Sequence, residues 1–169
     1  EKYQITMVPL TLQFGASLFL DRTTIANEQF YNQLESSPQY PTTSQPAYKD
    51  FINKYSYLSS HYNSTIGIHL SKAFSGTFSN SQRAAKAVSE QSGKEISVIN
   101  SNRISSALGL TVLRAAEAIE QGQSHQQIVS AVESWNDKNH ILVSAKTVKY
   151  LVKSGRLSHS KGVIGKLLG

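Results

Sequence analysis

Apolar residues along this chain follow two different spacings, which predicts strands alternating with helices. Short apolar runs typical of buried strands occupy 64–70 and 95–100, and a similar run over 4–14 is interrupted by Pro9. Residues 141–144 are a further predicted strand. Helical spacing predicts helices over 27–35, 46–60, 76–91, 104–121, a stretch from residue 125, 147–153 and a tail beginning at Lys161.

Residues that begin or end helices flank several of these segments. Asn27 is placed to cap the first helix, and Pro46 suits the first position of the second. Gly122 is expected to end the helix over 104–121, and Ser124 to cap the next one. The whole order predicts an α/β fold, with a mainly parallel sheet covered by helices on both faces. Ligands of such sheets bind beyond the carboxyl ends of the strands.

Two segments rich in hydroxyl groups, both predicted to be turns, come just before predicted helices. They are Pro41-Thr42-Thr43-Ser44-Gln45-Pro46 and Phe74-Ser75-Gly76-Thr77-Phe78-Ser79, and neither contains a charged residue or a histidine. Hydroxyls and free backbone N–H groups at a helix start form a neutral socket for an anion. This composition favours holding a carboxylate or a phosphate over cutting a bond.

Thr43 is the first candidate for binding such an anion, and Ser75 and Thr77 are the next. The alternative is that these hydroxyls only cap the helices that follow, as such residues commonly do. Gly76 favours binding, because a residue without a Cβ lets a ligand approach the backbone. Arg156 could pair with an anion or with the backbone of a loop.

Composition restricts the chemistry that the chain offers. Its 169 residues suffice for one domain with a core, and no apolar run approaches the roughly 20 residues of a membrane span. The beginning of the chain lacks the pattern of a signal peptide, and the lack of cysteine excludes disulfides, thiolate metal sites and a cysteine nucleophile. A cytoplasmic location is consistent with this usage.

The sequence offers no clear catalytic or metal-binding residues. It contains no HExxH, GxSxG or GxGxxG motif, and its five histidines lack the spacing of metal ligands. His69 is expected to be a buried imidazole in a strand. Ser101 and Ser105 could line the same end of the sheet or serve only in a turn. A small phosphotransferase or hydrolase remains an alternative, but it needs a base or a metal beside Ser75 or Thr77.

Positive charge is concentrated at the end of the chain. The net charge is +6, and the segment 138–169 contains seven Lys and Arg residues and no acid, so the remainder carries 6 − 7 = −1. A basic segment can attract nucleic acid, an acidic protein or a membrane, and it can also be an ordinary solvated face. A nucleic-acid binder is therefore a second alternative function.

Several motifs together resemble those of the DegV family of bacterial fatty-acid-binding proteins. The stretches that carry the resemblance are Ile5 to Gly15, Pro41 to Pro46 (PTTSQP), Ile68 to Phe78 with SGTF, Val98 to Ser101 with Gly109, and Ser154 to Ser158. Their order and spacing extend over almost the whole chain. Asn100 and Ala107 replace the Asp and Gly that are usual in this family.

The resemblance implies a long-chain fatty acid as ligand, held between an α/β N-terminal lobe and a smaller second lobe. It implies that Thr43 and Ser75 grip the carboxylate, with Thr77, Ser44 and Arg156 at neighbouring motif positions. It places the N-terminal lobe at 1–154, without its first strand, and the connection to a largely missing second lobe at 155–169. A fragment is therefore expected.

The same resemblance implies a partner. Members of the family can present the lipid to a separate fatty acid kinase subunit, and the acyl phosphate then feeds phospholipid synthesis. This role requires no cofactor and no nucleic acid, and transient membrane contact is compatible with it.

Overall fold

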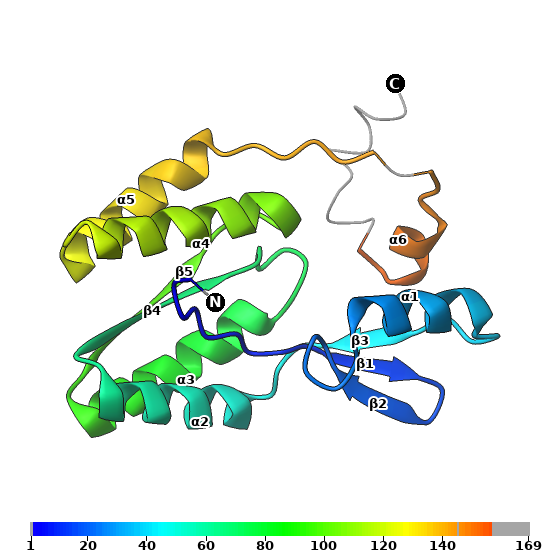
Figure 1. The fold of residues 1–169 in the computed structure, drawn as a ribbon, viewed down its shortest axis with the longest axis horizontal. Helices are drawn as coiled ribbons and strands as arrows, with labels where there is room; N and C mark the ends of the chain where they lie inside the picture. Colours follow the sequence, from blue (N-terminus) through cyan, green and yellow to red (C-terminus); the bar gives the residue numbers. More distant parts are fainter. Residues whose placement is uncertain (1, 145, 157–169) are drawn as a thin grey trace. The chain divides into compact units, whose positions relative to one another are not determined.

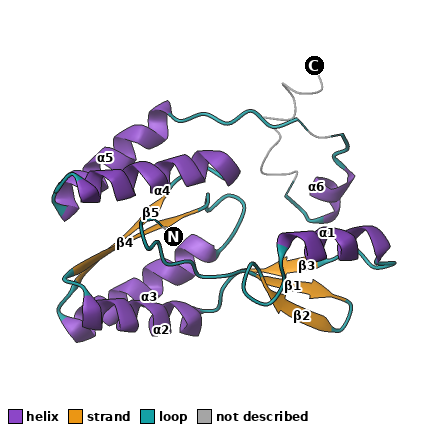
Figure 2. Cartoon of the chain, viewed as in Figure 1, coloured by secondary structure: helices purple, strands orange, loops and turns teal. Residues whose placement is uncertain are grey.

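The structure is a computed structural model that describes residues 2–144 and 146–156 (Figure 1). Its strands are β1 (Thr11–Phe14), β2 (Ser17–Leu20), β3 (Thr42–Ser44), β4 (Ser64–His69) and β5 (Glu95–Asn100). Its helices are α1 (Asn27–Ser36), α2 (Tyr48–His61), α3 (Thr77–Ser92), α4 (Ser105–Glu120), α5 (His125–Lys138) and α6 (Lys149–Lys153) (Figure 2). The α/β class predicted from the sequence is confirmed.

The chain forms two compact units, and their boundaries pass through β4, α3 and β5. The first unit contains the chain up to Gly67 together with Ser79–Val98. The second contains Ile68–Phe78 and the chain from Ile99 onward. The boundary predicted between residues 154 and 155 lies at the edge of the described residues and stays a prediction.

A three-stranded antiparallel sheet in the first unit has the order β2-β1-β3. Gly15 begins the two-residue turn between β1 and β2 with φ +57°, a conformation that L side chains rarely adopt. Leu12 and Phe14 of β1 are buried on one face with Ile25, and Phe19 and Phe30 pack against them. Phe30 belongs to α1, so this helix covers that face of the sheet (Figure 1).

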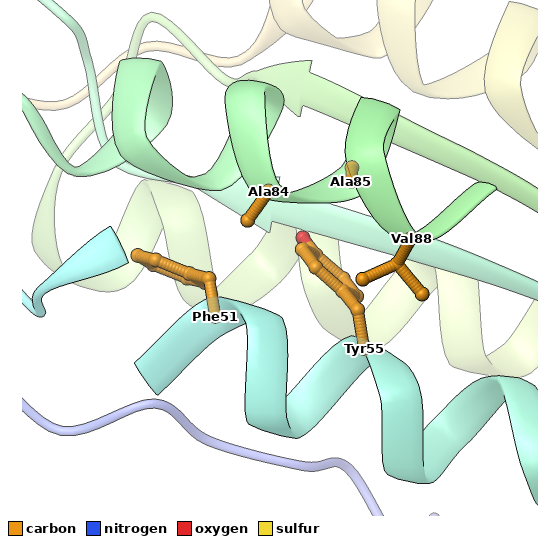
Figure 3. Packing of buried hydrophobic residues seen from close by; sticks show 5 residues of the cluster. All are labelled: Phe51, Tyr55, Ala84, Ala85 and Val88. Atoms are coloured by element: carbon orange, nitrogen blue, oxygen red, sulfur yellow. The ribbon is translucent and has the colours of Figure 1, made fainter. Parts of the chain in front are cut away.

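The second apolar cluster of this unit joins α2 to α3. Phe51 and Tyr55 of α2 point toward three small residues of α3, Ala84, Ala85 and Val88 (Figure 3). Ile96 and Val98 of β5 pack against the same cluster. The Tyr55 hydroxyl lies 2.6 Å from the Ser81 hydroxyl, and burial raises the pKa of Tyr55 while this hydrogen bond opposes the rise.

Strands β4 and β5 form a two-stranded sheet and end side by side. At their ends, the Ser101 N–H donates to the His69 carbonyl at 3.0 Å, and the Ser71 N–H donates to the Arg103 carbonyl at 2.9 Å. From the first of these bonds to the second, the residue number rises by two in both segments. The two segments therefore run in the same direction, and β4 and β5 are parallel. Their carboxyl ends therefore share one edge, as the sequence predicted for this pair.

In the second unit, α4 and α5 pack as an antiparallel helical pair joined by a short turn (Figure 1). Gly122 follows α4 with φ +76°, and the Ser124 hydroxyl accepts from the Gln127 N–H at 3.3 Å. The sequence predicted both Gly122 as the end of the first helix and Ser124 as the N-cap of the second. Buried residues on the facing sides are small in α4 and β-branched in α5: Ala107, Thr111, Ala115, Ala118, Ile128 and Val132.

A polar network ties the end of α5 to the loop after β5. The Arg103 guanidinium donates to the backbone carbonyls of Asn136 and Asn139, near the negative end of the helix. The Asn139 amide donates in turn to the Ala107 carbonyl at 2.7 Å and to the Thr111 hydroxyl at 3.2 Å. Arg103 therefore stabilises the unit and was not identified as important from the sequence.

Some predicted elements are wrong or displaced. Residues 4–10 form no strand, because only Thr11–Phe14 find partners in β2 and β3, and 141–144 form no strand either. Ala26, not Asn27, is the N-cap of α1. The helices predicted from Gly76, Ile104 and Thr147 begin one or two residues later, and the tail from Lys161 lies outside the described residues.

Replacing Phe51 should test the α2–α3 cluster. Phe51 is 1% exposed, so Phe51→Ala leaves a cavity and is expected to lower the free energy of unfolding by about 3–5 kcal/mol. Tyr57→Ala on the same helix is the control; Tyr57 is 57% exposed, and its loss should cost less than about 1 kcal/mol. Urea unfolding measures both. Equal losses would contradict this description of the core.

Candidate functional site

The first hydroxyl-rich segment is a strand, not the turn that was predicted. Thr42–Ser44 form β3, whose three residues are exposed and pair with β1. Thr43 lies directly opposite Leu12, so the two side chains share one face of the sheet. Thr43 therefore borders the buried cluster of Leu12, Phe14 and Ile25. Thr42 and Ser44 point to the opposite face, because successive strand residues alternate.

The hydroxyls of β3 do not cap α2, so the capping alternative is wrong for this segment. Helix α2 begins at Tyr48, with Ala47 as its N-cap residue, and the Asp50 carboxylate accepts from the Ala47 N–H at 2.8 Å. Pro46 precedes the N-cap and is not the first helical residue. The Thr43 hydroxyl is consequently not used at the start of the helix that follows it.

Pro46 anchors this segment to the rest of its unit. It is among the fully buried residues, and its carbonyl accepts from the Asn80 side-chain amide at 3.0 Å. Asn80 lies in the first turn of α3, 34 residues further along the chain. Asn80 was not identified from the sequence, although its place on the face of the predicted helix that carries Ala84 could have indicated a contact with the interior.

The second hydroxyl-rich segment is a turn that leads into α3, as predicted. The Ser75 hydroxyl lies 2.8 Å from the Thr77 hydroxyl and accepts from the Thr77 N–H at 3.2 Å. Ser75 is half-buried, whereas Thr77 is only 4% exposed. The structure therefore places Ser75 and Thr77 together, with the half-buried Gly76 between them, and Ser75 serves locally as a cap.

The Ser75 hydroxyl can form a further hydrogen bond in addition to those that cap α3. When Thr77 donates both its N–H and its O–H to Ser75, the two lone pairs of the Ser75 oxygen are occupied. The proton of Ser75 is then directed at a further acceptor. This donor stands at the positive end of α3, whose first turn contains no acidic residue. The arrangement suits an anion.

Arg156 is held against the same turn. Its Nε donates to the Phe74 carbonyl at 3.3 Å, so the pairing with loop backbone that the sequence suggested is confirmed. Gly155, with φ +71°, turns the chain after α6 and brings Arg156 into this position. Arg156 thereby stabilises the backbone of the turn immediately before Ser75.

His69 lies at the end of β4 and is largely removed from solvent. Burial lowers the pKa of its imidazole from 6.5 to about 4, so the ring is neutral near pH 7. This supports the expectation of a buried imidazole. Ser101 is fully buried and its hydroxyl exchanges hydrogen bonds with the Arg103 backbone, which fits a role in the turn, whereas Ser105 is exposed.

A hollow of about 350 Å³ in the first unit lies away from these hydroxyls. Its wall consists of Ala26 and residues on one side of α1: Glu28, Gln29, Asn32, Gln33 and Ser36. The hollow is open to solvent, and Glu28 places a carboxylate beside any anion bound there. We therefore do not assign this hollow to the candidate site.

Neither a metal site nor a membrane span emerges from the described part of the chain. Across residues 2–144 and 146–156, no three His, Asp or Glu side chains gather as metal ligands, and no helix has the length and apolarity to cross a bilayer. Lys138, Lys146 and Lys153 are exposed. Lys161 and Lys166 lie outside the described residues, and binding through the basic segment stays untested.

Comparison with known proteins gives one family for the whole sequence. The sequence model of the DegV family, a family of uncharacterised proteins, matches residues 1–169. The chain belongs to the DegV family. The DegV domain-containing protein SAR1438 of Staphylococcus aureus (strain MRSA252) is 32% identical over 168 residues. That match covers 99% of this chain and 58% of the relative, so the chain spans little more than half of its relatives' length.

Solved structures of DegV proteins share the fold. One is described as DegV, a fatty acid binding protein from Bacillus subtilis; it is 29% identical, with a TM-score of 0.82 over 97% of this chain and 57% of its own. A DegV family protein from Thermus thermophilus, described by its fatty acid binding, is 28% identical, with a TM-score of 0.81 over 99% of this chain and 59% of its own.

A third structure is similar in fold alone. The Fatty Acid Kinase (Fak) B3 protein of Streptococcus pneumoniae, loaded with linoleic acid, is 21% identical, with a TM-score of 0.70 over 77% of this chain and 45% of its own. The predicted resemblance to DegV proteins is thus confirmed at the level of family and fold.

Lowering the pH should destabilise the protein through His69. Above pH 6.5 the imidazole is neutral in both states; between pH 6.5 and about 4 only the unfolded chain takes up the proton, so stability falls as the pH falls. The full loss is up to about 3 kcal/mol. Thermal unfolding from pH 7.5 to 4.5 should show a shallower pH dependence in His69→Gln, whereas exposed His140→Gln should follow the unmodified protein. Identical profiles for all three would contradict this effect.

Proposed function

We propose that this chain binds a long-chain fatty acid and holds its carboxylate with neutral hydroxyl donors. Thr43 and Ser75 are the principal donors. Thr77 orients Ser75, Arg156 holds the turn through Phe74, and Gly76 lets the carboxylate approach the backbone. Ser44, which points to the other face of β3, is a secondary donor.

The observation that carries this proposal is the paired hydroxyl turn at the start of α3. Ser75 accepts from the Thr77 N–H and is 2.8 Å from the Thr77 hydroxyl; when that hydroxyl donates to Ser75, the Ser75 proton is available for the ligand. A carboxylate has only acceptor oxygens and fits such a donor at a helix N-terminus. The description of the B. subtilis relative as a fatty acid binding protein supports this choice of anion.

The hydrocarbon tail and the carboxylate of the ligand contribute differently to the free energy of binding. A tail of about 16 carbons, at about 0.8 kcal/mol for each buried CH₂, offers a gross gain near 10 kcal/mol, much of which ordering offsets. A hydrogen bond to a charged head contributes about 1.5–3 kcal/mol. The tail therefore sets most of the affinity, and the hydroxyls set the orientation of the carboxylate.

Orientation matters if the carboxylate is presented to another protein. We infer that a separate kinase subunit in the cytoplasm phosphorylates the bound acid, while this chain supplies the hydroxyl donors that orient the carboxylate. The name of the S. pneumoniae Fatty Acid Kinase (Fak) B3 protein supports a connection with fatty acid kinase. In this reading the chain is a carrier, and the acyl phosphate that results enters phospholipid synthesis.

Removing each principal donor should weaken binding of palmitate. Thr43→Val and Ser75→Ala each remove one hydrogen bond to the carboxylate, so the dissociation constant should rise about ten-fold. Isothermal titration measures it, and acyl phosphate formation with a fatty acid kinase subunit should fall further than binding does, because the head is no longer oriented.

Two neighbouring hydroxyls provide controls. Thr42→Val changes a hydroxyl of the same strand to which the proposal assigns no role, and Ser79→Ala changes an exposed hydroxyl in the first turn of α3, so both should bind palmitate like the unmodified protein. Unchanged affinity and phosphorylation in both donor variants would refute the assigned head-group site. Turnover of a substrate by the purified chain alone would instead favour the enzyme alternative.

A further inference from the structure

The Pro46 carbonyl needs a hydrogen-bond donor from outside its own helix. It precedes Ala47, whose carbonyl is the one that accepts the N–H groups of Asp50 and Phe51 at the start of α2. Pro46 is fully buried, and an unpaired carbonyl at such a place is costly. The Asn80 amide supplies the donor at 3.0 Å, across 34 residues of sequence.

This bond fixes the Pro46 end of the segment 42–46, which carries Thr43. The other end is fixed by β3, in which Thr42, Thr43 and Ser44 are in register with β1. Only Gln45 separates the last strand residue from Pro46. The orientation of the Thr43 side chain therefore depends on two anchors, the ladder to β1 and the contact between Pro46 and Asn80.

The helix that carries Asn80 is itself held firmly against α2. Ser81, the next residue, is fully buried and bonds the Tyr55 hydroxyl at 2.6 Å. One turn along, the Arg83 guanidinium stands 5.2 Å from the centre of the Tyr48 ring, at cation–π distance. Asn80 thus has a fixed position from which its amide reaches Pro46.

We propose that Asn80 is a positioning residue for fatty acid binding, acting through Pro46 to hold Thr43 in the orientation that meets the carboxylate. This inference rests on the proposed function. Asn80 itself makes no contact with the ligand in this proposal. Its loss should therefore matter only while Thr43 carries a hydroxyl, which a general loss of stability would not reproduce.

A double-mutant cycle tests this dependence. Palmitate is titrated into the unmodified protein, Asn80→Ala, Thr43→Val and the double variant. Asn80→Ala should raise the dissociation constant about three- to ten-fold in the unmodified background and leave it unchanged in the Thr43→Val background. Equal effects in both backgrounds would show that Asn80 supports the fold generally and would overturn the proposal.

Ser89→Ala is the matched control, because Ser89 also lies on α3 and its hydroxyl donates to a backbone carbonyl, that of Lys94, at 2.7 Å. It should lower the melting temperature as Asn80→Ala does, without changing palmitate affinity. If Ser89→Ala weakens binding as much as Asn80→Ala, the effect is one of helix stability and the proposal fails.

Hydrogen exchange of the ligand-free protein separates the anchor from the ligand. Amides of residues 42–45, 47 and 48 should exchange faster in Asn80→Ala and not in Ser89→Ala. Unchanged exchange would refute the anchor whatever the lipid data show. Faster exchange with unaltered palmitate affinity, where Thr43→Val does weaken binding, would refute the positioning role and leave the proposed function standing. No palmitate binding by the unmodified protein would refute both.

Discussion

Close packing of α2 on α3 is the interaction on which the first unit depends. Phe51 and Tyr55 approach α3 because Ala84 and Ala85 present almost no side chain there (Figure 3). Burying two aromatic rings provides most of the favourable free energy available to this pair of helices. The close approach also brings polar atoms into reach, so that Tyr55 bonds Ser81 and Asn80 bonds the carbonyl before α2.

These polar contacts give the packing a single register. Apolar surfaces alone tolerate small shifts of one helix along another, whereas a buried hydroxyl or amide requires its partner at one place. The register in turn determines where β3 and its Thr43 hydroxyl lie within the unit. The packing of α2 on α3 thus helps to specify the position of Thr43, a candidate binding group that lies before α2 in the sequence.

The two hydroxyl-rich segments differ in how their geometry arises. Ser75 and Thr77 are two residues apart, and their hydrogen bonds form within one turn. Local sequence is enough to specify them, as the prediction of a turn before α3 shows. Thr43 belongs to a strand that exists only because β1 lies beside it, so its segment was predicted as a turn.

The sequence by itself determined the elements whose hydrogen bonds are local. Helices α2 and α4 lie within two residues of their predicted bounds, and α5 begins where it was predicted, after the cap Ser124. The family motifs could also be identified without a structure. Only the tertiary structure decided which extended segments pair, since a strand is stable only beside a partner. It likewise decided that Asn80 contacts Pro46 and that Arg103 contacts the end of α5. These contacts join groups that are distant in sequence, and a local sequence pattern does not show which distant residues the fold brings together.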